Sequence, residues 1–140
     1  MTPIVTGDVV GQRATVTPET DPNTQWWWDA LARGEFRVPH CTSCDGSFFP
    51  PMPACPHCGS TAVDHRRSTG DGTIYSWITV HLAQDPAFVD ETPYTVVAVH
   101  LPEGARLFGR IAEGKLADGM PVRAVPYQVG GTTLLGFERI

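Results

Sequence analysis

The second half of the chain alternates short apolar runs with turns, as strands of a small β structure do. The runs are rich in β-branched and aromatic residues, which favour extended backbone. They predict strands at residues 73–80, 94–101, 106–111, 121–127 and 132–137. Gly109 in the third run indicates a bulge or a close approach of another backbone. Five strands with a short turn or helical insert at 112–119, between the third and fourth, match the order of an OB-type barrel.

The segment before this β region carries one helical pattern. Thr20 or Asp21 can cap a helix that Gly34 ends, which predicts a helix over residues 22–33. Residues 1–19 show no clear period and are interpreted as an arm without a fixed fold of its own.

Three tandem tryptophans, Trp26, Trp27 and Trp28, lie in the predicted helix. Because successive helical residues turn by about 100°, the three rings fan over roughly 200° and cannot all enter one narrow core. We expect Trp27 or Trp28 to join Leu31 on the buried stripe and at least one ring to stay exposed. Exposed tryptophan is typical of interface anchors, so the three residues are predicted to bind a partner protein.

The chain has four cysteines, arranged as two C-x2-C hooks: Cys41, Cys44, Cys55 and Cys58. Two such hooks supply the tetrahedral set of four sulfurs that zinc prefers, which predicts a structural zinc ribbon. Gly46 and Gly59 follow the hooks and are expected to supply a positive φ where the chain leaves the metal. His57 lies inside the second hook, but four sulfurs already fill the shell and leave no place for a fifth ligand.

Two alternatives use the same four cysteines. Disulfides are disfavoured because the N-terminus has no signal-peptide pattern and cytosolic proteins rarely keep disulfides. Iron in a rubredoxin-like site has the same geometry, and the spacing alone does not separate the two metals. Zinc is preferred because the chain has no flavin or redox-partner motif. A closed shell of four thiolates has no open position for substrate, so the metal is expected to hold structure and perform no chemistry.

Length and composition suit a small metal module beside one compact β domain. We divide the 140 residues into an arm and helix at 1–37, a zinc ribbon at 38–69 and a barrel at 70–140. The formal net charge is −5, and four thiolates with Zn²⁺ change it by −4 + 2, to −7. Such a charge disfavours nucleic acid as a partner. No apolar run approaches the roughly 18 residues of a membrane span, so a soluble, cytoplasmic protein is expected.

Catalytic groups are not evident in this chain. Zinc claims every cysteine, which removes the usual thiol nucleophile. The histidines are scattered, and those at the strand ends, His81 and His100, fit rim or partly buried polar residues better than a general base. The chain is therefore expected to be inactive alone. Four arginines raise a separate possibility, which is that they bind the phosphates of coenzyme A. Each one singly fits an ordinary surface charge better. These residues are Arg66, Arg67, Arg106 and Arg110.

From about residue 25 to its end, the chain resembles a known family of acyl-CoA-associated proteins that join a rubredoxin-like zinc ribbon to an OB-fold. Five segments carry this resemblance, in order: Trp27 to Leu31, the four cysteines with Phe49-Pro50-Pro51 between them, Gly70 to Ser76, Pro93-Tyr94, and Gly119 to Val122. The cysteine spacing is shared by many ribbons, whereas the order of all five segments is much more specific.

The resemblance implies a small accessory subunit that binds a thiolase-like enzyme, supports its folding or assembly, and shapes its acyl-CoA entrance. Some members of the family act in bacterial steroid side-chain degradation, beside a lipid-transfer-protein-type aldolase that cleaves a β-hydroxyacyl-CoA by a retro-aldol reaction. This assignment of substrate and partner rests on analogy.

Two other functions stay open. The partner can instead be an acyl-CoA hydratase or an acetyltransferase. The chain can also be a single-stranded nucleic-acid-binding OB module, in which Tyr75, Trp77 and Tyr94 stack on bases. The acidic charge and the lack of a basic stripe weigh against nucleic acid.

Overall fold

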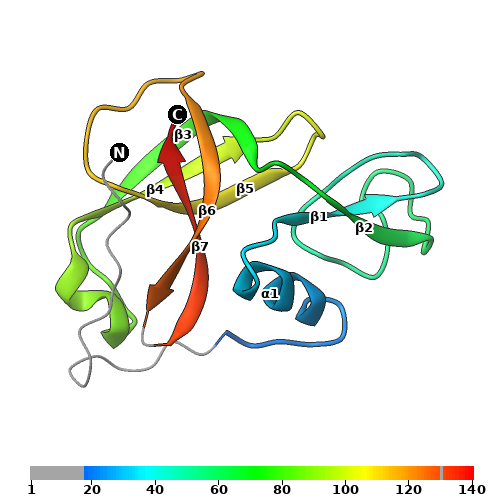
Figure 1. Cartoon of the computed structure of the whole chain (residues 1–140), viewed down its shortest axis with the longest axis horizontal. Coiled ribbons are helices and arrows are strands. Elements are labelled where there is room, and N and C mark those ends of the chain that lie inside the picture. The colour runs from blue at the N-terminus through cyan, green and yellow to red at the C-terminus, as the bar shows by residue number, and fades with distance from the viewer. Residues whose placement is uncertain (1–17, 130) are drawn as a thin grey trace.

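The computed structural model describes residues 18–129 and 131–140. Residues 1–17 of the predicted arm therefore lie outside the described residues. Figure 1 shows one helix beside a two-stranded ribbon, and a barrel next to both. The predicted fold class, mainly β with an N-terminal helix, a zinc ribbon and a five-stranded barrel, is confirmed. The division at 1–37, 38–69 and 70–140 stays a prediction.

The helix α1 spans Gln25–Ala32, inside the predicted range of 22–33. Asp21 does accept backbone N–H groups, from Asn23 at 2.8 Å and Thr24 at 3.0 Å, but these bonds close a turn before the helix begins. Gly34 takes a φ of 77°, which lets the chain leave the helix.

The ribbon consists of β1 (Arg37–Cys41) and β2 (Val63–Arg67), which pair antiparallel from Arg37 opposite Arg67 to Cys41 opposite Val63. Both cysteine hooks therefore lie at one end of this pair, because the first hook begins where β1 ends and the second lies in the connection between the strands. At the other end, the N–H of Ser68 donates to the carbonyl of Phe36 at 2.9 Å.

The barrel contains β3 (Asp71–Val80), β4 (Tyr94–His100), β5 (Arg106–Ile111), β6 (Pro121–Val129) and β7 (Thr132–Arg139). These strands close in the order β3-β4-β5-β7-β6, with β5 and β7 parallel and the other pairs antiparallel. A 3-10 helix, η1 (Pro86–Glu91), lies in the long connection between β3 and β4. The connection at 112–119 contains turns and no helix.

One apolar core joins the barrel interior to the helix and the base of the ribbon. Trp27, Leu31, Phe36 and Val38 belong to the same cluster as the inward-facing residues of the barrel. Figure 1 places α1 between the ribbon strands and β7, and the helix contacts both β1 and β7. The ribbon and the barrel are therefore packed on a common set of side chains.

Gly109 marks a close approach and not a bulge. A Cβ added at this residue would come within 2.8 Å of ring carbons of Phe137. The register between β4 and β5 is regular, whereas the irregularity lies in β3, between Ile74 and Ser76. Of the two interpretations of Gly109, close approach is confirmed and the bulge is wrong.

No helix in the described part of the chain has the length and apolar character needed to cross a membrane.

Candidate metal centre and partner-binding surface

The two cysteine hooks converge at one end of the ribbon. The sulfur atoms of all four cysteines lie within 4.8 Å of one another. The distance between the sulfurs of Cys41 and Cys58 is 3.7 Å, and that between Cys44 and Cys55 is also 3.7 Å. A tetrahedron with zinc–sulfur bonds of about 2.3 Å has edges of roughly 3.8 Å, so the donor set fits zinc.

The charges of the two hooks also favour binding of a cation. The backbone N–H of Cys44 lies 3.5 Å from the Cys41 sulfur and lowers the pKa of Cys41 to about 6. The N–H of Gly46 lowers the pKa of Cys44, but burial and the thiols of Cys55 and Cys41 raise it more, to about 12. Four thiolates this close repel one another, and a divalent cation supplies the missing positive charge.

The site is closed, which limits what it can do. None of the four cysteines forms a disulfide, and sulfurs 3.7 Å apart are far beyond the roughly 2.05 Å of a disulfide bond. The disulfide alternative is therefore wrong. Four sulfurs complete the coordination of zinc and leave no position for water or substrate. The zinc is structural.

The ring of His57 bonds to the protein backbone, whereas its own backbone N–H donates to the Cys55 sulfur at 3.3 Å. Its Nε2 lies 3.1 Å from the carbonyl oxygen of Ser47, and a carbonyl can only accept, so Nε2 is the donor. This bond ties the second hook to the segment after the first. Of the two glycines expected to carry a positive φ, Gly59 does, at 78°, but Gly46 does not. Asp45 adopts that conformation instead, at 62°.

His40 is a structural residue that the sequence interpretation missed. Its buried ring lies between two carboxylates, with Nε2 2.7 Å from Asp45 and Nδ1 3.1 Å from Asp64. It therefore connects the first hook to β2. Its position directly before Cys41 was the available signal, but the pairing with Asp64 requires the strand register.

The three tryptophans point at three different parts of the molecule. Trp27 is buried in the shared core, and its ring centroid lies 5.3 Å from that of Phe49. Trp28 is partly buried and packs edge-on against Trp27. It also lines a cleft of about 300 Å³ on the barrel, together with Phe108 and Leu134. The expectation that Trp27 or Trp28 joins Leu31 in the core is confirmed for Trp27.

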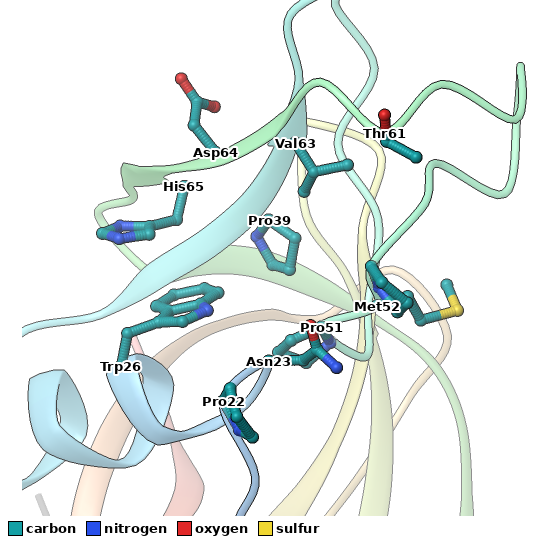
Figure 2. Close-up of a pocket in the computed structure, with 11 residues that line it drawn as sticks. Pro22, Asn23, Trp26, Pro39, Pro51, Met52, Thr61, Val63, Asp64 and His65 are labelled. Carbon is teal, nitrogen blue, oxygen red and sulfur yellow. The ribbon is translucent and has the colours of Figure 1, made fainter.

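Trp26 faces the ribbon. Figure 2 shows its ring beneath His65 of β2, and the two rings stack with centroids 4.1 Å apart and planes 10° apart. Trp26 and His65 line a second cleft, of about 320 Å³, which Pro51 and Met52 also line. Trp26 is partly buried, so none of the three rings is as exposed as expected. Since Trp27 is enclosed by the core, Trp26 and Trp28 are the rings with surface left for a partner.

The four arginines predicted to bind coenzyme A occupy two separate elements. Arg66 and Arg67 lie on β2 and are exposed, each with a nitrogen 3.9 Å from a carboxylate oxygen, of Asp45 and Glu35 respectively. Arg106 is exposed on β5 and its guanidinium lies 4.0 Å from the ring centroid of Tyr75.

Arg110 is already paired with the carboxylate of Glu91. Its side chain is 7% exposed and that of Glu91 is 3% exposed, and Nη1 of the arginine donates to Glu91 at 2.6 Å. The guanidinium also lies 3.9 Å from the centroid of the Tyr94 ring. This pair holds η1 against the outer side of β4 and β5. A coenzyme A site built from these residues would therefore rely on Arg66, Arg67 and Arg106, and such a site stays a prediction.

The aromatic residues considered for base stacking differ in availability. Tyr94 covers Arg110 and is partly buried, and Tyr75 stacks on Arg106. Of the three, only Trp77 is exposed and makes no ring contact with another of residues 18–129 and 131–140. The two histidines at strand ends, His81 and His100, are exposed as expected of rim residues.

Two family models match successive parts of the chain. The model of the ChsH2 rubredoxin-like zinc ribbon domain matches residues 28–64, and the model of the ChsH2 C-terminal OB-fold domain matches residues 65–126. Among solved structures, a chain of the Ltp2-ChsH2(DUF35) aldolase has a TM-score of 0.76 and 33% sequence identity, and the match covers 88% of this chain and 98% of that chain.

Curated relatives include subunits of hydratases. The chain is 38% identical, over 75% of its length, to a probable enoyl-CoA hydratase alpha subunit of Thermomonospora curvata. It is 30% identical, over 89% of its length, to the 3-oxo-4,17-pregnadiene-20-carboxyl-CoA hydratase alpha subunit of Mycobacterium tuberculosis. The matches span 33% and 40% of the lengths of these two proteins. The chain belongs to the ChsH2 family, which joins a rubredoxin-like zinc ribbon to a C-terminal OB-fold domain.

Proposed function

We propose that this protein is a non-catalytic accessory subunit of a thiolase-superfamily enzyme that acts on acyl-CoA. The observation that carries the proposal is the likeness to a chain of the Ltp2-ChsH2(DUF35) aldolase, which this chain matches over 98% of that chain's length. A match of this extent leaves little of the relative without a counterpart here, so a similar role as a subunit is the simplest inference.

The chemistry of the chain supports an accessory role. Every cysteine is a ligand in the closed zinc site, so none is available as the nucleophile of thiolase chemistry. His40 and His57 are used in packing the ribbon. We infer that the partner carries out the reaction, and that this chain binds it and contributes to the entrance of the acyl-CoA site.

The proposed reaction of the partner is a retro-aldol cleavage of a β-hydroxyacyl-CoA in steroid side-chain degradation. A partner of the hydratase class is the second candidate, favoured by the two relatives that are hydratase alpha subunits. Each partner gives a different product. Cleavage releases a shortened acyl-CoA and a carbonyl compound, whereas hydration adds water to a double bond and breaks no carbon–carbon bond.

Co-expression tests the proposal. The full-length chain is produced with a thiolase-like protein or, separately, with a hydratase-type acyl-CoA protein, and each mixture is passed over a size-exclusion column. We expect stable co-elution with the thiolase-like protein and carbon–carbon cleavage of a β-hydroxyacyl-CoA by that complex only. Cleavage or hydration by the purified chain alone would contradict a non-catalytic role. Co-elution with the hydratase-type protein alone would assign the second candidate.

Nucleic acid is the remaining alternative, and the charge of the chain argues against it. A net charge of −5 repels phosphates, and Arg110, on the face where OB-folds bind oligonucleotides, is paired with Glu91. Fluorescence anisotropy with a labelled single-stranded DNA is expected to show no binding at about 0.15 M salt. Binding that weakens steeply with added salt would revive this alternative.

A further inference from the structure

The second half of β3 has an open edge. On one side β3 pairs with β4 along residues 73–80, but on the other side β6 pairs only with Asp71, Gly72 and Thr73. The last backbone hydrogen bonds on that side are made by Ile74. From Tyr75 to Val80, no strand in the described part of the chain pairs with this edge.

This edge lacks the features that normally protect an exposed strand. Tyr75, Trp77 and Ile78 are 56%, 42% and 63% exposed, and residues 72–80 contain no charged side chain and no proline. Exposed edge strands in soluble proteins usually carry charges or proline, because an unpaired row of N–H and C=O groups is a template for another strand. Within residues 72–80 the register shift after Ile74 is such a device, and the guanidinium of Arg106 on β5 lies over the Tyr75 ring at the start of the edge.

The direction of the backbone groups follows from the ladder. In an antiparallel pair, successive residues direct their N–H and C=O groups alternately toward one neighbour and the other. Ile74 points away from β4, because its N–H donates to the carbonyl of Met120 at 3.0 Å and its carbonyl accepts from Gly119 at 2.8 Å. The shift between Ile74 and Ser76 inserts one residue. The alternation then directs the groups of Trp77 and Thr79 toward the open edge.

The neighbouring surface is apolar. Ile78 lies opposite Val96 of β4, and Phe108 of β5 lies opposite Ala98 in the adjacent row. Phe108 is 66% exposed, and both Val96 and Phe108 line the cleft that contains Trp28. The open edge is therefore continuous with the side of the barrel where the predicted anchor Trp28 lies.

We propose that residues 77–80 of β3 bind an extended segment of the partner enzyme as an added strand, with apolar side chains of that segment resting on Ile78 and Phe108. This deepens the proposed function and rests on it. An alternating row of N–H and C=O groups is satisfied by another extended backbone. The acidic charge of the chain, −5, favours a different protein over a second copy, because two copies repel each other.

Hydrogen exchange of backbone amides tests the added strand directly. The full-length chain is measured alone and in its complex with the thiolase-like protein. The amides of Trp77 and Thr79 are expected to exchange at least about tenfold more slowly in the complex. The amide of Ile78 faces β4 and serves as the internal reference, slow in both samples.

A pair of variants separates backbone from side chain. Thr79→Pro removes the N–H that faces the open edge and leaves the ladder to β4, so the dissociation constant is expected to rise about tenfold or more. Thr79→Ala keeps this N–H, and its dissociation constant is expected to change less than about threefold. Zinc content and circular dichroism verify that both variants fold. If Thr79→Pro does not fold, Ile78→Lys takes its place in the test. It adds a charge to an exposed side chain and is expected to weaken the complex.

Several results would overturn this inference. If the amides of Trp77 and Thr79 exchange as fast in the complex as in the free chain, the added strand is contradicted but the proposed function is not. Failure to form the complex would contradict both the added strand and the proposed function. Protection in the free chain that grows with concentration assigns the edge to a second copy. Protection in the free chain that is lost when residues 1–17 are deleted assigns it to the chain's own N-terminal segment.

Discussion

Single polar residues hold the zinc ribbon together around its metal. The His40 ring joins the carboxylates of Asp45 and Asp64, and His57 donates to the carbonyl of Ser47. Each bond connects segments that the four sulfurs also connect, so the metal and the hydrogen bonds fix the same geometry. His40 and His57 thus have structural roles in the ribbon.

His65 is expected to make the ribbon sensitive to acid. Burial and the nearby guanidinium of Arg37 lower the pKa of His65 below its usual 6.5. Arg37 Nε also donates to His65 Nδ1 at 2.7 Å, which requires that nitrogen to be unprotonated. The unfolded chain therefore binds the proton more tightly. The contribution of His65 to stability is complete above about pH 6.5 and is lost as the pH falls through the folded pKa.

Urea denaturation of the wild type and of His65→Gln, at about pH 7.5 and about pH 5.5, checks this prediction. The midpoint of the wild type is expected to fall more between the two pH values than that of the variant. Equal decreases would mean that other groups cause the acid sensitivity.

Gly109 is expected to tolerate no side chain. In Gly109→Ala the new Cβ would come within 2.8 Å of the Phe137 ring and 3.1 Å of the Leu135 carbonyl. Phe137 is fully buried and cannot move away cheaply, so the free energy of unfolding is expected to fall by about 1–3 kcal/mol. Chemical denaturation measures it, with Thr73→Ala as an exposed control. A loss equal to that of the control would show that β5 and β7 can separate.

Sequence reasoning was most successful where the signal was local. The cysteine spacing predicted the metal, because two residues between ligands already determine the tight turn. The roles of His40 and Arg110 were not readable, because their partners Asp64 and Glu91 lie 24 and 19 residues away. Arg110 therefore looked like a surface cation, although its guanidinium is buried.

At the level of the element, α1 acts as a joint between the ribbon and the barrel. The roughly 100° rotation per residue that prevents three rings from sharing one stripe instead gives each ring a different neighbour. Trp26 stacks on His65 of β2, Trp27 enters the core, and Trp28 lines the cleft on the barrel. Helical geometry predicted the fan, but not that the ribbon would cover Trp26.

The three rings are therefore expected to differ in their contribution to stability. Trp27→Ala would leave a cavity in the core and lower the free energy of unfolding by about 3–5 kcal/mol. Trp28→Ala, in a partly open cleft, is expected to cost less than half as much and to weaken the complex with the partner instead. Denaturation curves and isothermal calorimetry measure the two effects. Full stability of Trp27→Ala would contradict the shared core.

The strands show the same division between local and distant signals. The residue types predicted all five barrel strands, and their succession along the chain indicated an OB-type barrel. The open edge of β3 was not predictable, because it depends on where β6 stops pairing, at Thr73 opposite Pro121. A strand pattern reports burial of side chains and contains no information about which edge is covered.

At the scale of the whole molecule, the ribbon and the barrel share one apolar core, so we expect them to unfold together. Val38 at the base of the ribbon, Trp27 in the helix and Phe137 in the barrel all belong to one cluster. Melting of the ribbon would therefore expose part of the barrel core to water, so we expect zinc binding to stabilise the barrel as well.

Loss of zinc is consequently expected to destabilise the entire chain. Cys55→Ser removes one of four ligands, so zinc content is expected to fall well below one per chain and the melting temperature to fall with it, because metal binding and folding are coupled. Calorimetry is expected to show one transition, shifted down, in the variant and in chelator-treated wild type. Ser43→Ala, a neighbour that is not a ligand, is the control. An unchanged barrel transition would contradict a shared core.

The position of Trp27 limits how the protein can be taken apart. A truncation that begins at Asp71 would preserve every barrel strand but delete Trp27, Leu31, Phe36 and Val38, which fill part of the interior. The excised barrel would present an apolar opening to solvent and aggregate, although its sequence looks like a self-sufficient module. Any dissection of this protein into pieces should therefore keep the helix attached to the barrel.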